Sequence, residues 1–328
     1  MPRLVPAEYH FIPVSAVTEG HDVQRLAIEK HIFPALKPAR QRIAFLWSHS
    51  NGFHKESLHP VMRRFLSNLR SKSGLDDVDV HFIAWDARNH GDSARLNEGT
   101  FKETYTWFDN AMDTKQVIDQ MRLKSDYNVL IGIGHSFGAT SVLLCEFFYP
   151  RTFDAMCLIE PVIGPNIDAL KNVAQYPIMA SRNRRDEWPS REECLQSLVK
   201  RPFWKRFDPE VLKLYVDYGM YETPNGTIKL KCPKEQEFRN FFLQSYPRAT
   251  GFASLETVSV PCHFIYALES DFLDPSDAHL VTGRNEKRFT IDFIQGGHMV
   301  PNERPDLVAN HIIKIVDRLF GEIFPSKL

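Results

Sequence analysis

The feature that most restricts the fold is the turn Gly134-His135-Ser136-Phe137-Gly138, which joins two different hydrophobic patterns. Residues 128–133 form a short apolar run with β-branched residues, as expected for a strand buried on both faces. From Ala139 onward the apolar residues recur at helical spacing. A turn this tight holds its serine at a strained backbone angle, and a Cβ atom at either flanking glycine would clash. A Gly-x-Ser-x-Gly turn between strand and helix predicts a nucleophile at Ser136.

The rest of the chain alternates between strand-like and helix-like segments. This alternation predicts an α/β fold with a mostly parallel, twisted, doubly wound sheet. Residues 166–253 are rich in charged and aromatic residues and lack a clear buried strand, which indicates a helical cap inserted into a core of residues 1–165 and 254–328. We expect strands at 8–17, 23–31, 42–47, 78–85, 128–133, 153–159, 261–268 and 287–294, and helices at 60–70, 107–121, from 139, and 306–324.

Composition excludes several classes of protein. With 328 residues, a net charge of −1 and no block of Lys or Arg, the chain shows no feature of nucleic-acid binding. No apolar run reaches the length of a transmembrane helix, and the first residues do not form an export signal. The five cysteines are scattered without metal-ligand spacing, so we expect reduced thiols, no metal site and no cofactor.

A nucleophilic serine requires a base and an acid that orients the base. His298 follows the last expected strand, and Gly296 and Gly297 before it allow the loop to turn back over the sheet, so we predict that His298 is the general base. For the acid, Asp271 is favoured because it lies on the loop before the strand that leads to the histidine. Glu160 remains the alternative, since a carboxylate at the end of a buried strand is hard to explain as a solvated group.

Two backbone N–H groups are expected to form an oxyanion hole. In this type of site one donor is the residue after the nucleophile and the other lies on the loop after the third strand. Phe137 and Asn51 occupy these positions. His49 and the charged turn at residues 86–93 are interpreted as structural bracing of the loops.

The chain closes with Ser326-Lys327-Leu328. This tripeptide at a free C-terminus is the address read by the peroxisomal import receptor. The sequence therefore predicts that receptor as a partner and the peroxisomal matrix as the location.

These motifs resemble the α/β-hydrolase superfamily over nearly the whole chain. The supporting segments are residues 49–52, 86–93, 134–138 and 296–298. More narrowly, Asn89-His-Gly-Asp-Ser-Ala94, residues 133–138, Leu158-Ile-Glu-Pro-Val162 and the final tripeptide resemble the fungal peroxisomal hydrolases, a group with the yeast peroxisomal lipase and hydrolases of toxin-biosynthesis clusters. The yeast pattern keeps a carboxylate at the position of Glu160 and lacks one at Asp271, so the identity of the acid stays open.

The resemblance implies a small ester or acyl substrate, a Ser–acid–His triad and no cofactor. We therefore expect a serine hydrolase of esterase or lipase type that works through an acyl-enzyme. Two alternatives are a thioesterase that acts on acyl-CoA and a non-catalytic binding protein of the same fold.

Overall fold

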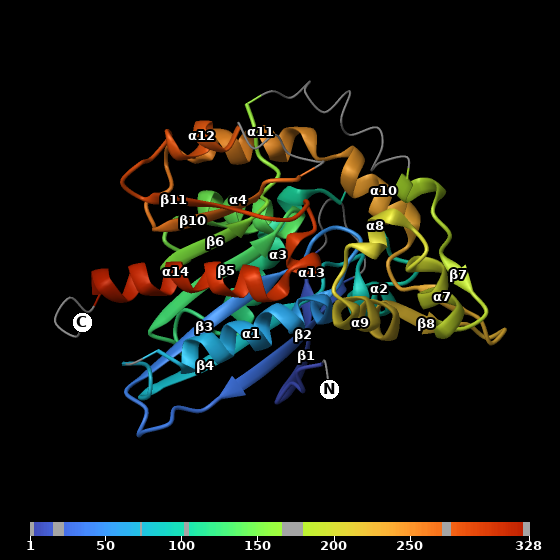
Figure 1. The fold of residues 1–328 in the computed structure, drawn as a ribbon, viewed down its shortest axis with the longest axis horizontal. Helices are drawn as coiled ribbons and strands as arrows, with labels where there is room; N and C mark the ends of the chain where they lie inside the picture. Colours follow the sequence, from blue (N-terminus) through green and yellow to red (C-terminus); the bar gives the residue numbers. More distant parts are fainter. Residues whose placement is uncertain are drawn as a thin grey trace.

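An eight-stranded sheet forms the centre of the molecule (Figure 1). The computed structural model describes residues 3–15, 23–72, 74–101, 105–165, 180–270 and 277–323. The first three strands in the sheet order pair antiparallel, and every later pair is parallel. The sheet is therefore mostly parallel, as predicted. In spatial order the strands are β1 (Glu8–Val14), β2 (Gln24–Phe33), β4 (Val78–Trp85), β3 (Gln41–Ser48), β5 (Val129–His135), β6 (Ala155–Ile159), β10 (Cys262–Ala267) and β11 (Phe289–Ile294).

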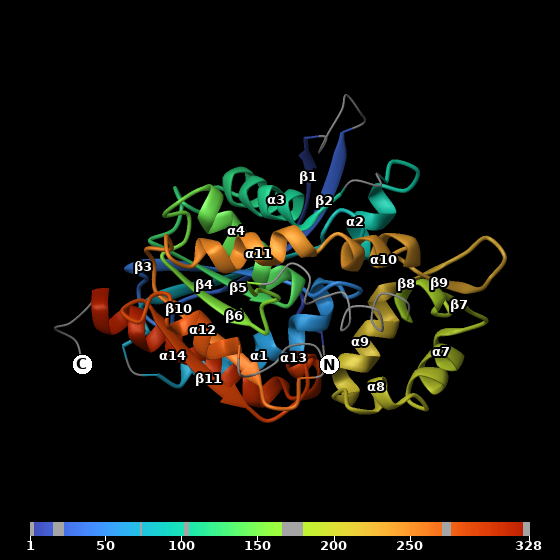
Figure 2. The same cartoon turned by 90° about the horizontal axis from the view of Figure 1, so that it is seen from above.

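Helices cover both faces of this sheet (Figure 2). All residues of β5, β6 and β10 are buried, which explains why these strands are continuous apolar runs. One face packs on α1 (His59–Arg70) and α14 (Pro305–Ile323), which contact each other. The other face packs on α3 (Trp107–Gln120), α4 (Phe137–Phe148) and α11 (Ser245–Ser254).

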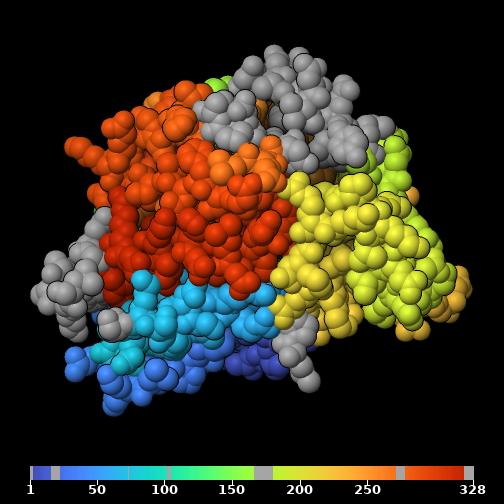
Figure 3. Space-filling view, viewed as in Figure 1, coloured from blue at the N-terminus to red at the C-terminus, as the bar shows by residue number. Residues whose placement is uncertain are grey.

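Residues 180–242 form a lobe beside the sheet, drawn in yellow-green to light orange in Figure 3. Its own core includes Trp188, Trp204 and Tyr215, together with Phe53 and Met299 from the sheet domain. The sequence predicted a helical cap. The lobe also contains a three-stranded antiparallel sheet of order β7-β9-β8. Its elements are β7 (Glu187–Trp188), α7 (Arg191–Leu198), α8 (Pro202–Lys205), α9 (Pro209–Gly219), β8 (Met220–Glu222), β9 (Ile228–Leu230) and α10 (Lys234–Phe242).

Besides these elements, the described part of the chain contains several short helices and buried cysteines. The five cysteines, all in the described part of the chain, are buried free thiols, as expected. Within the described ranges, no helix combines the length and the apolarity needed to cross a membrane. The short helices are η1 (Lys55–Leu58), α2 (Gly91–Leu96), α12 (Asp277–Thr282) and α13 (Val300–Glu303).

Candidate active site

Ser136 lies in the tight turn between β5 and α4. Its backbone has φ 54° and ψ −117°, a conformation that a non-glycine residue rarely adopts. A Cβ atom on Gly134 would come within 2.6 Å of the backbone of Ala139 in α4, as the close approach of strand and helix requires. A Cβ on Gly138 would instead come within 2.5 Å of the Ser48 carbonyl oxygen at the end of β3. The second glycine therefore allows the helix to approach a neighbouring strand.

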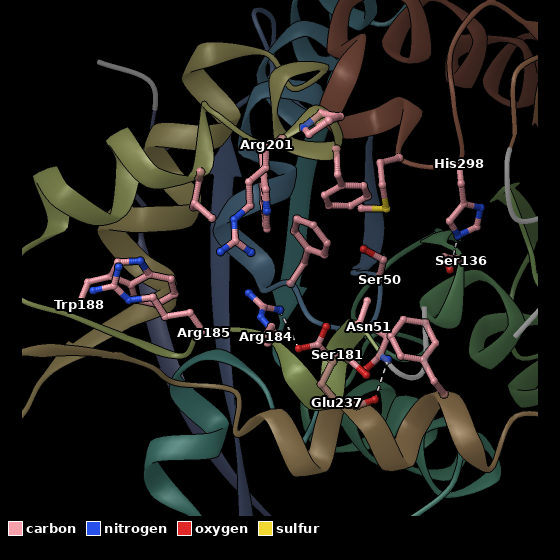
Figure 4. A pocket seen from close by; sticks show the side chains of 18 residues that line it. Ser50, Asn51, Ser136, Ser181, Arg184, Arg185, Trp188, Arg201, Glu237 and His298 are labelled. Atoms are coloured by element: carbon pink, nitrogen blue, oxygen red, sulfur yellow. Dashed lines mark hydrogen bonds and ion pairs between the residues drawn. The ribbon is translucent and has the colours of Figure 1, made fainter. Parts of the chain in front are cut away.

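His298 follows β11 and directs its ring towards the serine (Figure 4). The distance from His298 Nε2 to Ser136 Oγ is 2.8 Å. His135, the last residue of β5, supports the loop that carries His298. Its Nε2–H donates to the His298 carbonyl oxygen at 2.9 Å. Burial lowers the pKa of His135 to about 3, so this supporting ring is neutral at pH 7.

Glu160 is the carboxylate that contacts the other nitrogen of His298. It directly follows β6, is fully buried, and its Oε2 lies 2.9 Å from His298 Nδ1. Two further donors hold it in place, because the Ala267 N–H donates to Oε1 and the Ser270 hydroxyl donates to Oε2, both at 2.6 Å. With its proton on Nδ1, facing the carboxylate, the His298 ring presents the Nε2 lone pair to the serine hydroxyl.

Asp271, the acid favoured from the sequence, lies outside the described residues. The described carboxylate at His298 Nδ1 is the alternative, Glu160. Ser270 and Ala267, which bond to Glu160, belong to β10 and its following loop, so the expected loop does contribute contacts to the acid site. Sequence reasoning assigned no role to Ser270.

The two expected oxyanion donors belong to two different segments, the start of α4 and the loop after β3. Phe137 is the first residue of α4, so its N–H has no partner within the helix. Asn51 lies on the loop after β3 and lines the same pocket as Ser136 and His298. Its side chain is fixed by α10, since Asn51 Nδ2 donates to the Glu237 carbonyl oxygen at 3.1 Å.

Buried histidines brace the loop that carries Asn51. His49 donates from Nδ1 to the Ser50 carbonyl oxygen at 2.8 Å and accepts from the Ala87 N–H at 3.1 Å. Burial lowers its pKa to about 4, so it is neutral at pH 7. His90 accepts from the Gly52 N–H at 2.9 Å, and burial lowers its pKa well below the usual range. His49 therefore has the contacts of a structural histidine, as interpreted from the sequence.

A pocket of about 490 Å³ opens beside Ser136 and extends into the lobe (Figure 4). Its volume is in the range of small-molecule sites. Its charged groups are Arg184, Arg185, Arg201 and Glu237, to which sequence reasoning assigned no role. Most of its remaining wall is apolar, with Phe53, Trp188, Leu198, Phe203, Trp204, Phe241 and Met299.

Among the described residues, one buried cluster has the composition of a metal site. Potential ligand atoms of Glu29, His31 and His59 lie within 4.8 Å of one another. The Leu4 N–H donates to His59 Nδ1 at 3.2 Å, so the ring carries its proton on Nε2, which faces Glu29 Oε2 at 2.9 Å. Arg3 pairs with the other carboxylate oxygen at 2.7 Å. These bonds engage both ring nitrogens of His59 and both carboxylate oxygens of Glu29, so we interpret the cluster as a hydrogen-bond network.

Comparison with known proteins identifies the family. The model of the Alpha/beta hydrolase family matches residues 45–311. The chain therefore belongs to the alpha/beta hydrolase family, and the fold predicted from its motifs is confirmed.

Two curated relatives come from fungi. The chain is 27% identical over 231 residues to the type I acyl-CoA thioesterase mpaH of Penicillium roqueforti, a match that covers 68% of this chain and 50% of that protein. The chain thus spans about half the length of that relative. It is 23% identical over 291 residues to the peroxisomal membrane protein LPX1 of Saccharomyces cerevisiae, covering 83% of this chain and 74% of LPX1. These matches confirm the resemblance to the fungal hydrolases.

Solved structures show the same fold. The peroxisomal alpha-beta-hydrolase Lpx1 of Saccharomyces cerevisiae superposes with a TM-score of 0.81 at 20% identity, covering 98% of this chain and 90% of Lpx1. The thioesterase domain from the curacin biosynthetic pathway superposes with a TM-score of 0.64 at 12% identity, covering 93% of this chain and 99% of the domain.

Proposed function

We propose that this chain is a serine hydrolase that cleaves carboxylic esters through an acyl-enzyme, with Ser136 as nucleophile, His298 as base and Glu160 as orienting acid. The observation that carries the proposal is the continuous contact from Ser136 Oγ to His298 Nε2 and from His298 Nδ1 to Glu160 Oε2, at 2.8 and 2.9 Å. This arrangement matches the geometry that activates a serine hydroxyl.

In the first half of the proposed reaction, Ser136 Oγ attacks the ester carbonyl carbon while His298 Nε2 takes the hydroxyl proton. The N–H groups of Phe137 and Asn51 hold the negative oxygen of the tetrahedral intermediate. His298 then gives the proton to the leaving oxygen, the bond from carbon to that oxygen breaks, and the acyl-enzyme remains. Glu160 stabilises the charged imidazole in both directions of proton transfer.

In the second half, water attacks the acyl-enzyme and His298 takes its proton. The intermediate collapses, the proton passes to Ser136 Oγ, and the carboxylic acid leaves. The apolar pocket wall, with Trp188 and Trp204 from the lobe, favours a substrate with a hydrophobic body.

The second candidate function is thioester hydrolysis by the same steps, with a thiol as leaving group. It is favoured by the Penicillium relatives, whose names describe acyl-CoA thioesterases. Parallel assays on an acyl-CoA and on the p-nitrophenyl ester of the same acid separate the two candidates. A kcat/KM at least tenfold higher for one of them identifies the preferred leaving group.

We propose a peroxisomal location, supported by the name of the yeast relative and by the motif Ser326-Lys327-Leu328. The motif itself lies outside the described residues. Fluorescence imaging of an N-terminally tagged chain should show punctate peroxisomal signal that becomes cytosolic when the tripeptide is deleted. An unchanged distribution after deletion would remove the import receptor as a partner.

The experiment that tests the enzymatic proposal is labelling with a fluorophosphonate probe. Wild-type protein should be labelled at Ser136, as shown by mass spectrometry of the modified peptide. Absence of labelling, under conditions in which a known serine hydrolase reacts, favours the non-catalytic alternative.

A further inference from the structure

We propose that the natural substrate carries an anionic group, a carboxylate or a phosphate, and that this group binds Arg201 in the part of the pocket away from Ser136. This inference rests on the proposed function. The inference begins with the charges of the pocket wall. Arg184 is neutralised by Glu237, with 2.7 Å between Arg184 Nη1 and Glu237 Oε2, and also donates to the Tyr215 hydroxyl at 2.6 Å. Arg185 pairs with Glu193 at 3.0 Å.

Arg201 differs from the other two arginines. Within the described ranges, no carboxylate, carbonyl or hydroxyl group contacts its guanidinium group. Figure 4 shows this side chain directed into the pocket on the side of Arg184. Among the described residues of the pocket wall, Arg201 is therefore an exposed positive charge without a counter-charge, and its neighbours Leu198, Phe203 and Trp204 supply apolar surface.

The backbone at Arg201 is held in place. Pro202 follows it as the first residue of α8, which restricts Arg201 to the extended conformation observed, with φ −94° and ψ 136°. The Arg201 N–H donates to the Leu198 carbonyl oxygen at 2.9 Å. The guanidinium group is a planar fork of N–H donors that suits a carboxylate or a phosphate. The fixed backbone limits where this fork can lie.

The pocket thus combines a nucleophile, an apolar wall and a cation. An ester with a hydrophobic body and an anionic end would meet all three at once. The anion can come from the acyl side, as in the monoester of a dicarboxylic acid, or from the leaving group, as in the phosphates of coenzyme A. Both sources share the chemistry that Arg201 recognises, and a matched set of substrates distinguishes them.

The acyl side is tested with p-nitrophenyl hexanoate and mono-p-nitrophenyl adipate, which differ by a terminal carboxylate. The leaving-group side is tested with hexanoyl-CoA and hexanoyl-pantetheine, which share the thioester and the thiol arm but differ in the phosphorylated nucleotide. Arg201→Gln should lower kcat/KM about tenfold or more for the anionic member of one pair, because a charge-assisted hydrogen bond is lost. The neutral member should change by less than about twofold, since the wall around it is intact.

Lys200→Gln is the matched control, because Lys200 is the adjacent exposed cation and does not line the pocket. It should leave all four substrates unchanged, and Arg201→Lys should recover part of the loss. Added salt should weaken the preference of the wild type for the anionic substrate more than that of Arg201→Gln. A loss that is equal for neutral and anionic members, or no loss at all, overturns the proposal.

A binding measurement separates this proposal from the proposed catalytic function. Calorimetric titration of Ser136→Ala with adipate and with coenzyme A requires no turnover. One of these two compounds should bind to Ser136→Ala at least tenfold more tightly than it binds to the Ser136→Ala, Arg201→Gln double variant. Equal binding to both proteins rejects the anion site even where ester hydrolysis is found, whereas weaker binding to the double variant supports the site even where no hydrolysis is found.

Discussion

Ser136 and Glu160 are the first residues beyond a directly paired position on two adjacent parallel strands, and both have a positive φ angle. The paired residues are His135 on β5 and Ile159 on β6, and the φ values of Ser136 and Glu160 are 54° and 49°. The Ser136 N–H donates to the Ile159 carbonyl oxygen at 2.9 Å, which links the two turns. The residue after each strand thus has a strained backbone conformation, and the side chains of Ser136 and Glu160 both contact His298.

Replacing Ser136 by alanine should remove ester hydrolysis. We expect kcat to fall by about 10⁴-fold or more, because Ser136 Oγ is the hydroxyl oxygen that lies 2.8 Å from His298 Nε2. Steady-state kinetics with p-nitrophenyl hexanoate measure this effect, and circular dichroism verifies that the fold is kept. Residual activity close to that of the wild type would assign the nucleophile elsewhere.

Glu160→Gln should lower kcat by about 10³-fold to 10⁴-fold, because the amide offers a donor where His298 Nδ1 needs an acceptor and so favours the wrong tautomer. Asp271→Asn is the matched comparison, since it makes the same chemical change at the acid favoured from the sequence. We expect that variant to retain activity within about threefold. The reverse order of the two effects, measured in the same assay, would return the role to Asp271.

Ser270→Ala tests whether the hydrogen bonds around Glu160 contribute to its position. Loss of the 2.6 Å bond to Glu160 Oε2 should lower kcat about tenfold. In the Glu160→Gln background the same change should have almost no further effect, because the carboxylate that Ser270 positions is already absent. Additive losses in this double-mutant cycle would show that Ser270 acts independently of the acid.

The sequence sufficed to predict the sheet, the turn at Ser136 and the position of His298. Each of these depends on a local signal: buried strands have continuous apolar runs, and Gly134 and Gly138 are required where a Cβ would collide with backbone. The choice between Asp271 and Glu160 as the acid depends instead on contacts between residues far apart in the sequence. Asp271 and Glu160 both follow strands of one sheet edge, and the donors on Glu160 come from the β10 strand and the loop after it, more than a hundred residues away.

The lobe was predicted less completely. Its small sheet has strands of two or three residues, too short for an alternating pattern. One local signal was present, because Asn225-Gly226 lies between β8 and β9 and is typical of a hairpin turn. The pocket charges could not be paired from the sequence, since Arg184 and Glu237 are 53 positions apart.

Gly138→Ala should destabilise the fold by about 3 kcal/mol, although alanine is the better helix former. The added Cβ would lie 2.5 Å from the carbonyl oxygens of Ser48 and His49, which are backbone atoms and cannot rotate away. Gly226→Ala is a control with open space around the new Cβ, and its positive φ of 78° should cost only about 1 kcal/mol. Urea unfolding compares the two, and equal midpoints would contradict the steric argument.

Acidification should destabilise the protein through His135, which lies beneath His298. Burial lowers the pKa of His135 from 6.5 to about 3, so the folded state holds the neutral ring while the unfolded chain takes up a proton below pH 6.5. The stability from this residue is therefore present above pH 6.5 and is lost as the pH falls towards 3. Between pH 6.5 and 4.5 the loss should be about 2 kcal/mol.

His135→Gln removes this titration while its amide can still donate to the His298 carbonyl oxygen. Unfolding free energies at pH 6.5 and 4.5 should therefore differ less in His135→Gln than in the wild type, by about 2 kcal/mol. If His135→Gln loses as much stability on acidification as the wild type does, the ring at position 135 is not held neutral by burial.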